Sequence, residues 1–429
     1  MPDTTRTDTD THSAQTDGIR TNEDRILDIA LDSGLIILQS GGETYRAEET
    51  MGTVACSLGA AHASAFVTPT VVMLTCVDSR NQSRTRIERV QDRSINLGRI
   101  ARVNELSHRL VDHRDRPADL RKAETVLRRI RNEPLHGKAG VIFATALSCY
   151  CFSFMFNGSP AEAACAFVIG ACLRVLLFAL NSLRLSSFIV TIIGGLMVSL
   201  ASGLAALSAL VPGAGNVSIS VLMTLVPGLA IVNAIRDIIS GDLVAGSARL
   251  LEAFVIASAL SLGAAGGLLL IPSLPGVSDL TYLTAPPASF ALAFLATAAF
   301  AWFYHITRYD ILWAALFGAA GWIVYLFVSH ELGNQFAGYL TGALIVGLCA
   351  EFTAVVARKP ATVYIVPGII PFVPGGGMYQ TMFEVVLGHG DAAAQKAFST
   401  LTAAASIAVG IAIASSLARL VSRFRQRKL

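Results

Sequence analysis

The last two-thirds of the chain is a series of long apolar segments, and this series limits the folds open to it. From residue 139 onward we count ten apolar segments long enough to cross a bilayer, which takes a helix of about 20 residues. They cover roughly 139–156, 161–180, 187–210, 218–240, 243–270, 287–304, 310–328, 334–356, 362–387 and 396–420. Only 15% of the residues are charged and the mean hydropathy is +0.58, as in a polytopic membrane protein.

The charges between these segments predict their orientation. Basic residues precede the first segment and recur in every second connection, as Arg184, Arg236, Arg308 and the pair Arg358 and Lys359. The alternate connections, 157–162, 211–218, 271–287 and 329–334, hold no Lys or Arg. Lys396, in the last of the alternate connections, is the exception. By the positive-inside rule, the sequence predicts a multi-pass protein of the plasma (inner) membrane with cytoplasmic N- and C-termini.

The stretch 1–138 has a different character, because its charges balance and the net charge of +3 comes from the apolar part. Residues 1–20 are polar and lack the basic start and apolar core of a signal peptide, so we expect a disordered tail. The helical spacing of apolar residues and the β-branched stretches in residues 21–138 predict a small cytoplasmic α+β domain. Its helices are expected around 27–35, 43–59, 100–110 and 120–130, and its strands at 65–78 and 84–91.

Two apolar segments repeat a pattern. The stretches 226-VPGLAIVNAIRDIISGD-242 and 373-VPGGGMYQTMFEVVLGHGD-391 both begin Val-Pro-Gly and end Gly-Asp. Each lies in the fourth span of a set of five, and consecutive sets of five must have opposite membrane orientation. Inverted repeats with helices broken at matching positions are typical of transporters. We therefore predict an all-α membrane fold of two inverted five-helix repeats, 139–270 and 287–420, with a basic cytoplasmic tail at 421–429.

The Pro-Gly breaks are candidates for the substrate site. Proline removes a backbone donor and leaves a carbonyl unpaired, and glycine allows close approach. A half-helix beginning after Gly228 or Gly376 would direct its N–H groups at an anion such as a carboxylate. The predicted substrate-binding residues are Pro227, Gly228, Asn233, Pro367, Gly368, Pro374, Gly375, Gly376 and Tyr379. Asn216 and Tyr379 could hydrogen-bond to a substrate hydroxyl. The alternative is that the prolines only kink packed helices.

Charged residues follow the first break. Asn233, Arg236 and Asp237 share one helical face, and Arg249 and Glu252 share another. Intramembrane carboxylates that change partner are the usual proton carriers. The predicted gate and proton-coupling residues are Arg236, Asp237, Asp242, Arg249, Glu252 and Glu351. The alternative is a cytoplasmic loop held by ordinary ion pairs. Glu384 must also face the bundle interior or water.

Five stretches resemble the threonine/serine exporter family. They are GGETYRAEETM (41–51), FVTPT (66–70), NLGRIARVNEL (96–106), residues 224–253 and residues 366–379. The resemblance covers about residues 21–420. It implies an inner-membrane exporter of L-threonine and L-serine driven by the proton motive force, with both halves fused in one chain. Some relatives look like dicarboxylate (succinate) exporters, so the resemblance leaves the substrate open.

The remaining motifs favour no enzyme. The chain has no P-loop, no Gly-x-Ser-x-Gly, no Cys/His spacing typical of zinc and no basic patch for nucleic acid, so we expect no cofactor and no metal. The histidines His305, His330 and His389 are expected at the membrane interface. The charged residues Glu43, Arg46, Glu48 and Glu49 are expected on a solvated helix face, and a sensor or hydrolase role of this domain remains the alternative. The sequence gives no oligomeric state.

Overall fold

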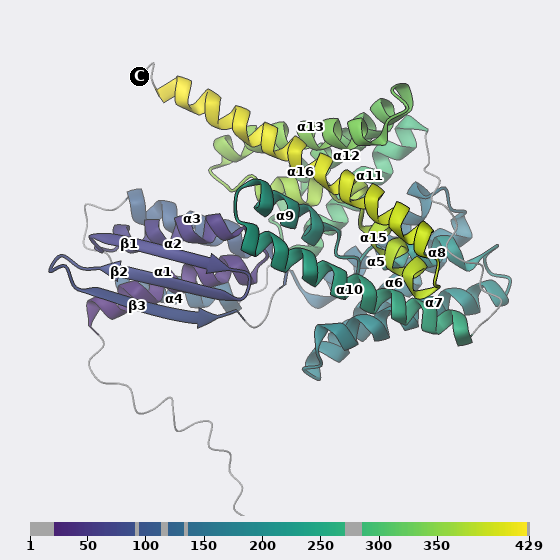
Figure 1. The fold of residues 1–429 in the computed structure, drawn as a ribbon, viewed down its shortest axis with the longest axis horizontal. Coiled ribbons are helices and arrows are strands. Elements are labelled where there is room, and N and C mark those ends of the chain that lie inside the picture. Colours follow the sequence, from purple (N-terminus) through teal and green to yellow (C-terminus); the bar gives the residue numbers. More distant parts are fainter. Residues whose placement is uncertain (1–20, 91–93, 113–118, 133–135, 271–284, 427–429) are drawn as a thin grey trace, which may run out of the picture. The chain divides into compact units, whose positions relative to one another are not determined.

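The computed structural model describes residues 21–90, 94–112, 119–132, 136–270 and 285–426. The tail expected at 1–20, most of the connection 271–287 and the last three residues lie outside the described residues. The described residues form two compact units, one from residues 21–90, 102–112 and 119–132, and the other from residues 94–101, 136–270 and 285–426 (Figure 1).

The first unit is a small α+β domain, as predicted. Its sheet has the order β1 (His62–Thr68), β2 (Val71–Val77), β3 (Ser83–Arg89), and both pairings are antiparallel. Helices α1 (Asn22–Gln39) and α2 (Thr44–Ser57) pack against the sheet, and α4 (Leu120–Asn132) packs against α1 (Figure 1). Helix α3 (Leu97–Asp112) begins in the second unit and continues into the first.

The prediction of a single strand at 65–78 is wrong. The chain there forms a hairpin, with the end of β1 and the whole of β2. The turn falls at Pro69 and Thr70, and Thr68 pairs with Val71 across it. Proline has no N–H for the ladder, so it favours the turn over the middle of a strand. The Thr68 hydroxyl also accepts a hydrogen bond from the Val71 N–H at 3.1 Å, which holds the turn closed.

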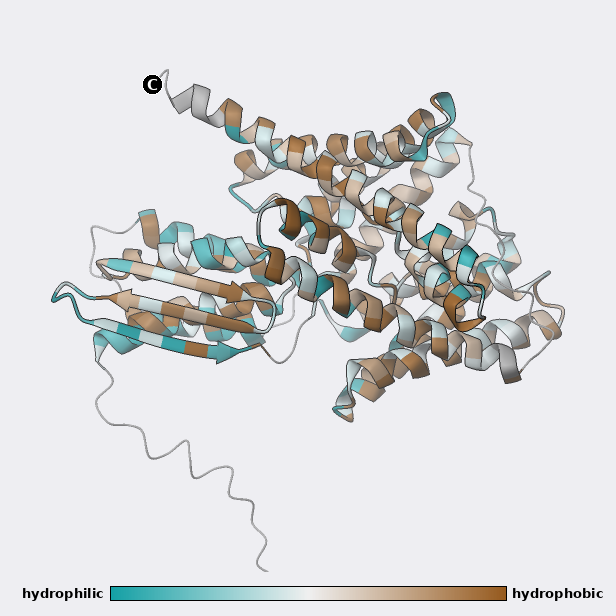
Figure 2. Cartoon of the chain, in the orientation of Figure 1, coloured by the Kyte–Doolittle hydropathy of each residue, from teal (hydrophilic) through white to brown (hydrophobic). Residues whose placement is uncertain are grey.

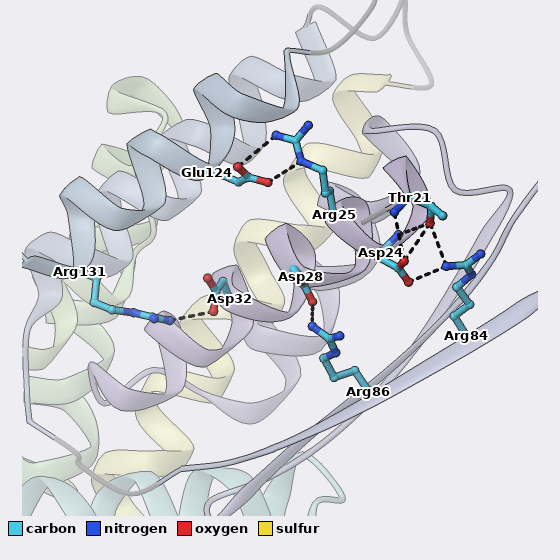
Figure 3. A network of polar contacts seen from close by, with 9 residues as sticks. All are labelled: Thr21, Asp24, Arg25, Asp28, Asp32, Arg84, Arg86, Glu124 and Arg131. Carbon is cyan, nitrogen blue, oxygen red and sulfur yellow. Dashed lines mark hydrogen bonds and ion pairs between the residues drawn. The ribbon is translucent and has the colours of Figure 1, made fainter. Parts of the chain in front are cut away.

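Ion pairs tie helix α1 to its neighbours (Figure 3). Arg25 pairs with Glu124 of α4 at 2.8 Å, and Asp32 pairs with Arg131 of α4 at 2.9 Å. On the other side of α1, Asp24 pairs with Arg84 at 2.5 Å and Asp28 with Arg86, both on β3. The hydrogen bond from Arg84 holds the pKa of Asp24 below its ordinary value. These pairs are partly open to water, so each contributes little alone and the packed leucines and isoleucines of α1 supply most of the stability.

Within the described residues of the second unit, eight helices are long and apolar enough to cross a membrane. They are α5 (Lys138–Met155), α6 (Pro160–Ser182), α7 (Ser187–Leu207), α10 (Leu243–Leu270), α11 (Pro286–Phe303), α12 (Arg308–Glu331), α13 (Gln335–Ala357) and α16 (Gly390–Gln426). Apolar residues dominate these helices, whereas β3 of the first unit is mainly hydrophilic (Figure 2). The protein is therefore a multi-pass membrane protein.

The other two predicted spans, 218–240 and 362–387, are not continuous helices. The first is α8 (Ala214–Leu222) followed by α9 (Gly228–Ile239). The second is α14 (Thr362–Gly368), the 3-10 turn η1 (Ile370–Phe372) and α15 (Gly375–Val386). The helices break where the Pro-Gly runs predict a break, although α15 starts at Gly375, before Gly376. Eight long helices and two broken segments thus replace ten equal spans.

Helix order and neighbours recur along this unit with a constant offset in the numbering. Adding 147 to Gly228, the start of α9, gives Gly375, the start of α15. Helix α7 packs on α10 as α13 packs on α16, and α5 packs on α6 as α11 packs on α12. The two sets also exchange partners, because α9 packs on α16 and α15 packs on α10. We call two positions related by this offset matching positions.

Glycines set the close approach of these helices in both sets. A Cβ on Gly195 of α7 would lie 2.7 Å from the Leu260 carbonyl oxygen of α10. A Cβ on Gly410 of α16 would lie 2.5 Å from the Leu340 carbonyl oxygen of α13. Small residues let membrane helices approach backbone to backbone, where van der Waals packing replaces the hydrophobic effect.

Candidate functional site

The two helix breaks lie against each other. A Cβ on Gly228 would stand 3.0 Å from the Gly375 Cα, and a Cβ on Gly375 would stand 3.3 Å from the Val226 Cβ. The preceding prolines have nearly the same conformation, with φ −80° and ψ 39° at Pro227 and φ −78° and ψ 41° at Pro374. Segments far apart in the sequence therefore bring two helix starts to one place, and the contact requires glycine on both sides.

The backbone gives this place a positive character. The first hydrogen bonds within the two half-helices run from the Ile231 N–H to Pro227 and from the Met378 N–H to Pro374, at 3.3 and 3.4 Å. The Gly375 N–H donates to the Val373 carbonyl at 2.8 Å, and the other N–H groups of the first turns have no acceptor within their own helix. Each half-helix also presents the positive end of its dipole there. Two such ends at one point form a candidate site for a carboxylate.

The predicted substrate residues divide into two groups. Pro227, Gly228, Pro374, Gly375 and Gly376 are at the two breaks, and all lie in half-helix starts or their caps. The other four, Asn233, Pro367, Gly368 and Tyr379, lie outside this junction.

Gly368 packs in α14, where a Cβ would lie 2.7 Å from the Val346 side chain of α13. Pro367, beside it, is buried inside the same helix. Tyr379 is buried and its ring lies 5.5 Å from that of Phe383. Asn233 is half-buried in the second turn of α9. Gly368 and Tyr379 therefore make packing contacts.

Asn216 has a structural role in this arrangement. Its amide nitrogen donates to the Phe156 carbonyl at 2.9 Å, and its oxygen accepts from the Ser153 hydroxyl at 2.6 Å. Both partners belong to the end of α5. The Asn216 side chain therefore holds α8 to α5, which leaves it less suited to the substrate contact expected from the sequence.

The charged residues after the first break contain a buried ion pair. Asp237 of α9 and Arg249 of α10 are 4% and 9% exposed, and the Arg249 Nε lies 3.0 Å from the Asp237 Oδ2. Asp242 accepts a hydrogen bond from the Ala245 N–H at 3.1 Å and so caps α10. Arg236 and Glu252 are half-buried in the same two helices. The structure thus brings Asp237 and Arg249 together, with the other three predicted gate residues on or between the same two helices.

Glu351, the remaining predicted gate residue, has a hydrogen-bond partner on a different pair of helices. It accepts a hydrogen bond from the Ser415 hydroxyl at 2.5 Å and links α13 to α16.

In the other unit, Glu43 is buried and pairs with Arg46 at 3.2 Å, and Glu48 accepts from the Val67 N–H at 2.9 Å. The expectation of a fully solvated helix face is therefore wrong for Glu43, because the helix start turns this residue into the domain.

A second buried charge cluster was missed in the sequence. Asp310 of α12 is 4% exposed, its Oδ2 lies 2.5 Å from the Lys359 Nζ, and its Oδ1 accepts from the Tyr364 hydroxyl at 2.7 Å. The Thr307 hydroxyl also bonds to Asp310. The available signal was an acid at the very start of an apolar segment, since a buried acid needs a nearby partner.

Two further positions were also missed. Arg174 lies within apolar α6, donates to the Thr145 hydroxyl at 3.0 Å and stands 4.3 Å over the Phe303 ring. In the sequence, Lys396 is only an exception to the alternation of basic and non-basic connections. In the structure its Nζ lies 3.5 Å from the Glu384 Oε1, and the His389 Nδ1 lies 2.8 Å from the Glu384 Oε2.

Comparisons with known proteins agree with this architecture. Residues 28–271 match the family described as "Putative threonine/serine exporter", and residues 289–417 match "Threonine/Serine exporter, ThrE". Similar curated proteins include the "Probable succinate transporter subunit YjjP" of Klebsiella aerogenes, 24% identical over 261 residues that cover 58% of this chain and 93% of the relative. The protein of the same description from Escherichia coli K12 is 25% identical over 266 residues, with coverages of 58% and 94%.

No solved structure matches the chain. The relatives correspond to about half of this protein, whereas the two family matches together run through both halves. The first match alone covers more than half of the chain, with the buried pair Asp237–Arg249 and the first break inside it. The chain belongs to the threonine/serine exporter family, with its two parts fused in one membrane protein.

Proposed function

We propose that the protein is a secondary exporter of a small solute that carries a carboxylate, with the contact of Gly228 and Gly375 as the substrate site. The observation that carries this proposal is the meeting of two half-helix starts at one point. In a membrane interior, freed backbone groups are tolerated where protein, water or a ligand satisfies them. A carboxylate that accepts from the N–H groups of both half-helices would do so.

The transport mode is alternating access between two inverted halves. The charge pattern of the connections gives the halves opposite orientations, and the helix order recurs with one constant offset. Inverted repeats with discontinuous helices open a central site to one side and then the other. Both termini are then cytoplasmic, α9 ends at the inner face and α15 ends at the outer face.

The first substrate class is L-threonine and L-serine, in antiport with protons. It is supported by the family and by the carboxylate that both amino acids carry. The buried carboxylates of Asp237 and Asp310 are available for proton coupling.

A dicarboxylate is the second candidate, and one structural observation favours it. Two positive helix ends lie at the same point, so each could hold one carboxylate of a short diacid. The curated relatives described as succinate transporter subunits agree with this alternative.

Counterflow in proteoliposomes tests the proposal and separates the candidates. Vesicles with the purified full chain are loaded in turn with unlabelled L-threonine, L-serine and succinate, and uptake of the labelled solute is followed. Uptake of threonine blocked by serine identifies an amino-acid exporter, and uptake of succinate alone identifies a dicarboxylate exporter. Absence of exchange for all three would contradict both candidates.

A matched pair of glycine variants tests the location of the site. Gly228→Ala should abolish exchange, because its methyl group would collide with the second break. Gly213→Ala is the control, since a Cβ there meets nothing within 4 Å and its φ of −164° suits any residue. Normal exchange by Gly228→Ala would move the site away from the breaks.

A further inference from the structure

The buried pair Asp237–Arg249 has a counterpart in the other half. Adding 147 to these positions gives Glu384 and Lys396, which also form an ion pair. In each half the acid is the tenth residue of the half-helix and the base is the seventh residue of the next long helix. The two halves therefore repeat an ion pair as well as a fold.

The turns between these helices repeat in the same way. Gly241 and Gly388 have φ values of 93° and 81°, in the left-handed region where glycine is favoured. The following N–H groups, of Asp242 and His389, each donate at 2.9 Å to the carbonyl of the acid, Asp237 and Glu384 respectively. Each acid is therefore held by the same turn in the same place.

The chemistry of the two pairs differs in a way that suits different roles. The first pair uses arginine, which stays protonated at any accessible pH, and its side chains are 5% and 10% exposed. The second uses lysine with a histidine beside it, and the Glu384 and Lys396 side chains are 19% and 25% exposed. Water reaches the Glu384 carboxylate, whereas the Asp237 carboxylate is closed to water in this structure, so the second pair is the one that is open to proton exchange here.

Among the described residues of its own turn and of the helices packed on α15, few other charges lie near Glu384. Its turn supplies His389, and α16 supplies Asp391 and Lys396 and then no charged residue before Arg419. Helices α9 and α10 also pack near α15, but α10 holds no charged residue after Glu252, and the charges of α9, Arg236 and Asp237, are at the far end from the break. Among the described residues, His389 and Lys396 are therefore the charged or titratable groups in contact with the Glu384 carboxylate.

We propose that Glu384 is the outer proton-accepting site of the transporter and the counterpart of the inner pair Asp237–Arg249. The inference rests on the proposed function, in which α15 ends at the outer face. A proton from the outer water binds an Oε of Glu384 and turns the carboxylate into a neutral acid. Lys396 and His389 favour the carboxylate while α15 packs on α16, so protonation of Glu384 is linked to the loss of both ion pairs and to the release of α15 from α16 at that mouth.

The closing experiment compares exchange with gradient-driven transport. Vesicles are loaded with whichever of labelled L-threonine, L-serine and succinate the wild type exchanges, and efflux is measured with an acidic exterior and with equal pH on both sides. Glu384→Gln should remove the acceleration of efflux by the acidic exterior, expressed relative to counterflow at equal pH. The matched control is Glu331→Gln, a carboxylate at the end of α12 that lies 3.7 Å from the ring of His330 and is mostly exposed.

The outcomes separate the inference from the proposed function. A wild type that exchanges none of the three solutes overturns both. A wild type that exchanges, with Glu384→Gln still responding to the gradient as Glu331→Gln does, overturns the inference alone. If Glu384→Gln also loses counterflow, the double variant Glu384→Lys with Lys396→Glu decides. Recovery of exchange and of the pH response supports the site, and no recovery contradicts it.

Discussion

The two broken segments have the same backbone course but different charges around it. Both half-helices start at a glycine after a proline, and both end near an acid that pairs with a base on the next helix. The pair in the first half is buried and uses Arg249. The pair in the second half is more open and uses Lys396 and His389. The backbone therefore repeats more faithfully than the side chains do.

The cluster around Asp310 makes the same point more strongly. The positions in the first half that match Asp310, Lys359 and Tyr364 hold uncharged residues, namely Ala163, Pro212 and Val217. A repeated backbone allows two exchangeable conformations. Unequal charges give the two conformations different energies and different responses to a proton, because only differential interaction can shift an equilibrium. Under the proposed alternating access, the fold would supply the alternation and the unshared charges its direction.

The largest expected effect comes from the buried pair. Asp237→Asn leaves the Arg249 guanidinium without its carboxylate in a buried place, which costs about 3–5 kcal/mol of stability. Glu384→Gln should cost less, about 0–1 kcal/mol, as at exposed pairs. Thermal unfolding in detergent measures both. The double variant Asp237→Asn with Arg249→Met should recover most of the loss, and equal losses for the two single variants would contradict the difference between the halves.

The next largest effect is expected at the Asp310 cluster. Tyr364→Phe removes a hydrogen bond to a buried carboxylate, which is worth about 1.5–3 kcal/mol. We expect a lower unfolding temperature and slower exchange of the transported solute. Tyr309→Phe, on the same helix as Asp310 but with its side chain almost fully exposed, is the control. Unchanged stability in Tyr364→Phe would show that the cluster does not hold α14 to α12.

Substitution of closely packed glycines should lower the stability equally in the two halves. Gly263→Ala and Gly410→Ala place a methyl group against backbone oxygens of α7 and α13, and overpacking of this kind costs about 1–3 kcal/mol. These are matching positions, so similar losses sharpen the comparison, and a loss in only one half would break it. Unfolding temperatures are read against Gly213→Ala.

The smallest effect lies outside the membrane unit. The hydrogen bond from Arg84 lowers the pKa of Asp24, so the stabilisation is present above the ordinary aspartate pKa of about 3.9 and is lost as the pH falls through the lowered value. Asp24→Asn should remove this dependence. Hydrogen exchange of α1 in the full chain, at neutral and at acid pH, measures it. The same acid-induced opening of α1 in the variant would contradict the assignment.

Local features of the fold could be predicted from the sequence. Apolar runs gave the long helices, and the Pro-Gly runs gave both breaks, because proline acts on its own helix within one turn. Local reasoning also has limits, as the strand expected at 65–78 shows. That stretch is rich in β-branched residues on both sides of Pro69, and the pairing of Thr68 with Val71 shows that the chain turns there.

The candidate site could be predicted only in part. The two breaks were found, but their contact was not, since Gly228 and Gly375 are far apart in the sequence and no local pattern reports a long-range approach. Asn216 looked like a substrate ligand until its bonds to α5 were seen. Lys396 looked like an exception until Glu384 was placed beside it.

The sequence by itself determined the class of protein, the number and place of the apolar segments and the positions of the breaks. Each of these depends on hydrophobicity and backbone geometry within about one helix, and both act locally. Only the tertiary structure decided which residues share a site. Burial turns Asp237 and Asp310 into tightly paired groups, because a charge removed from water needs a partner, and the packing of distant helices chooses which partner it meets.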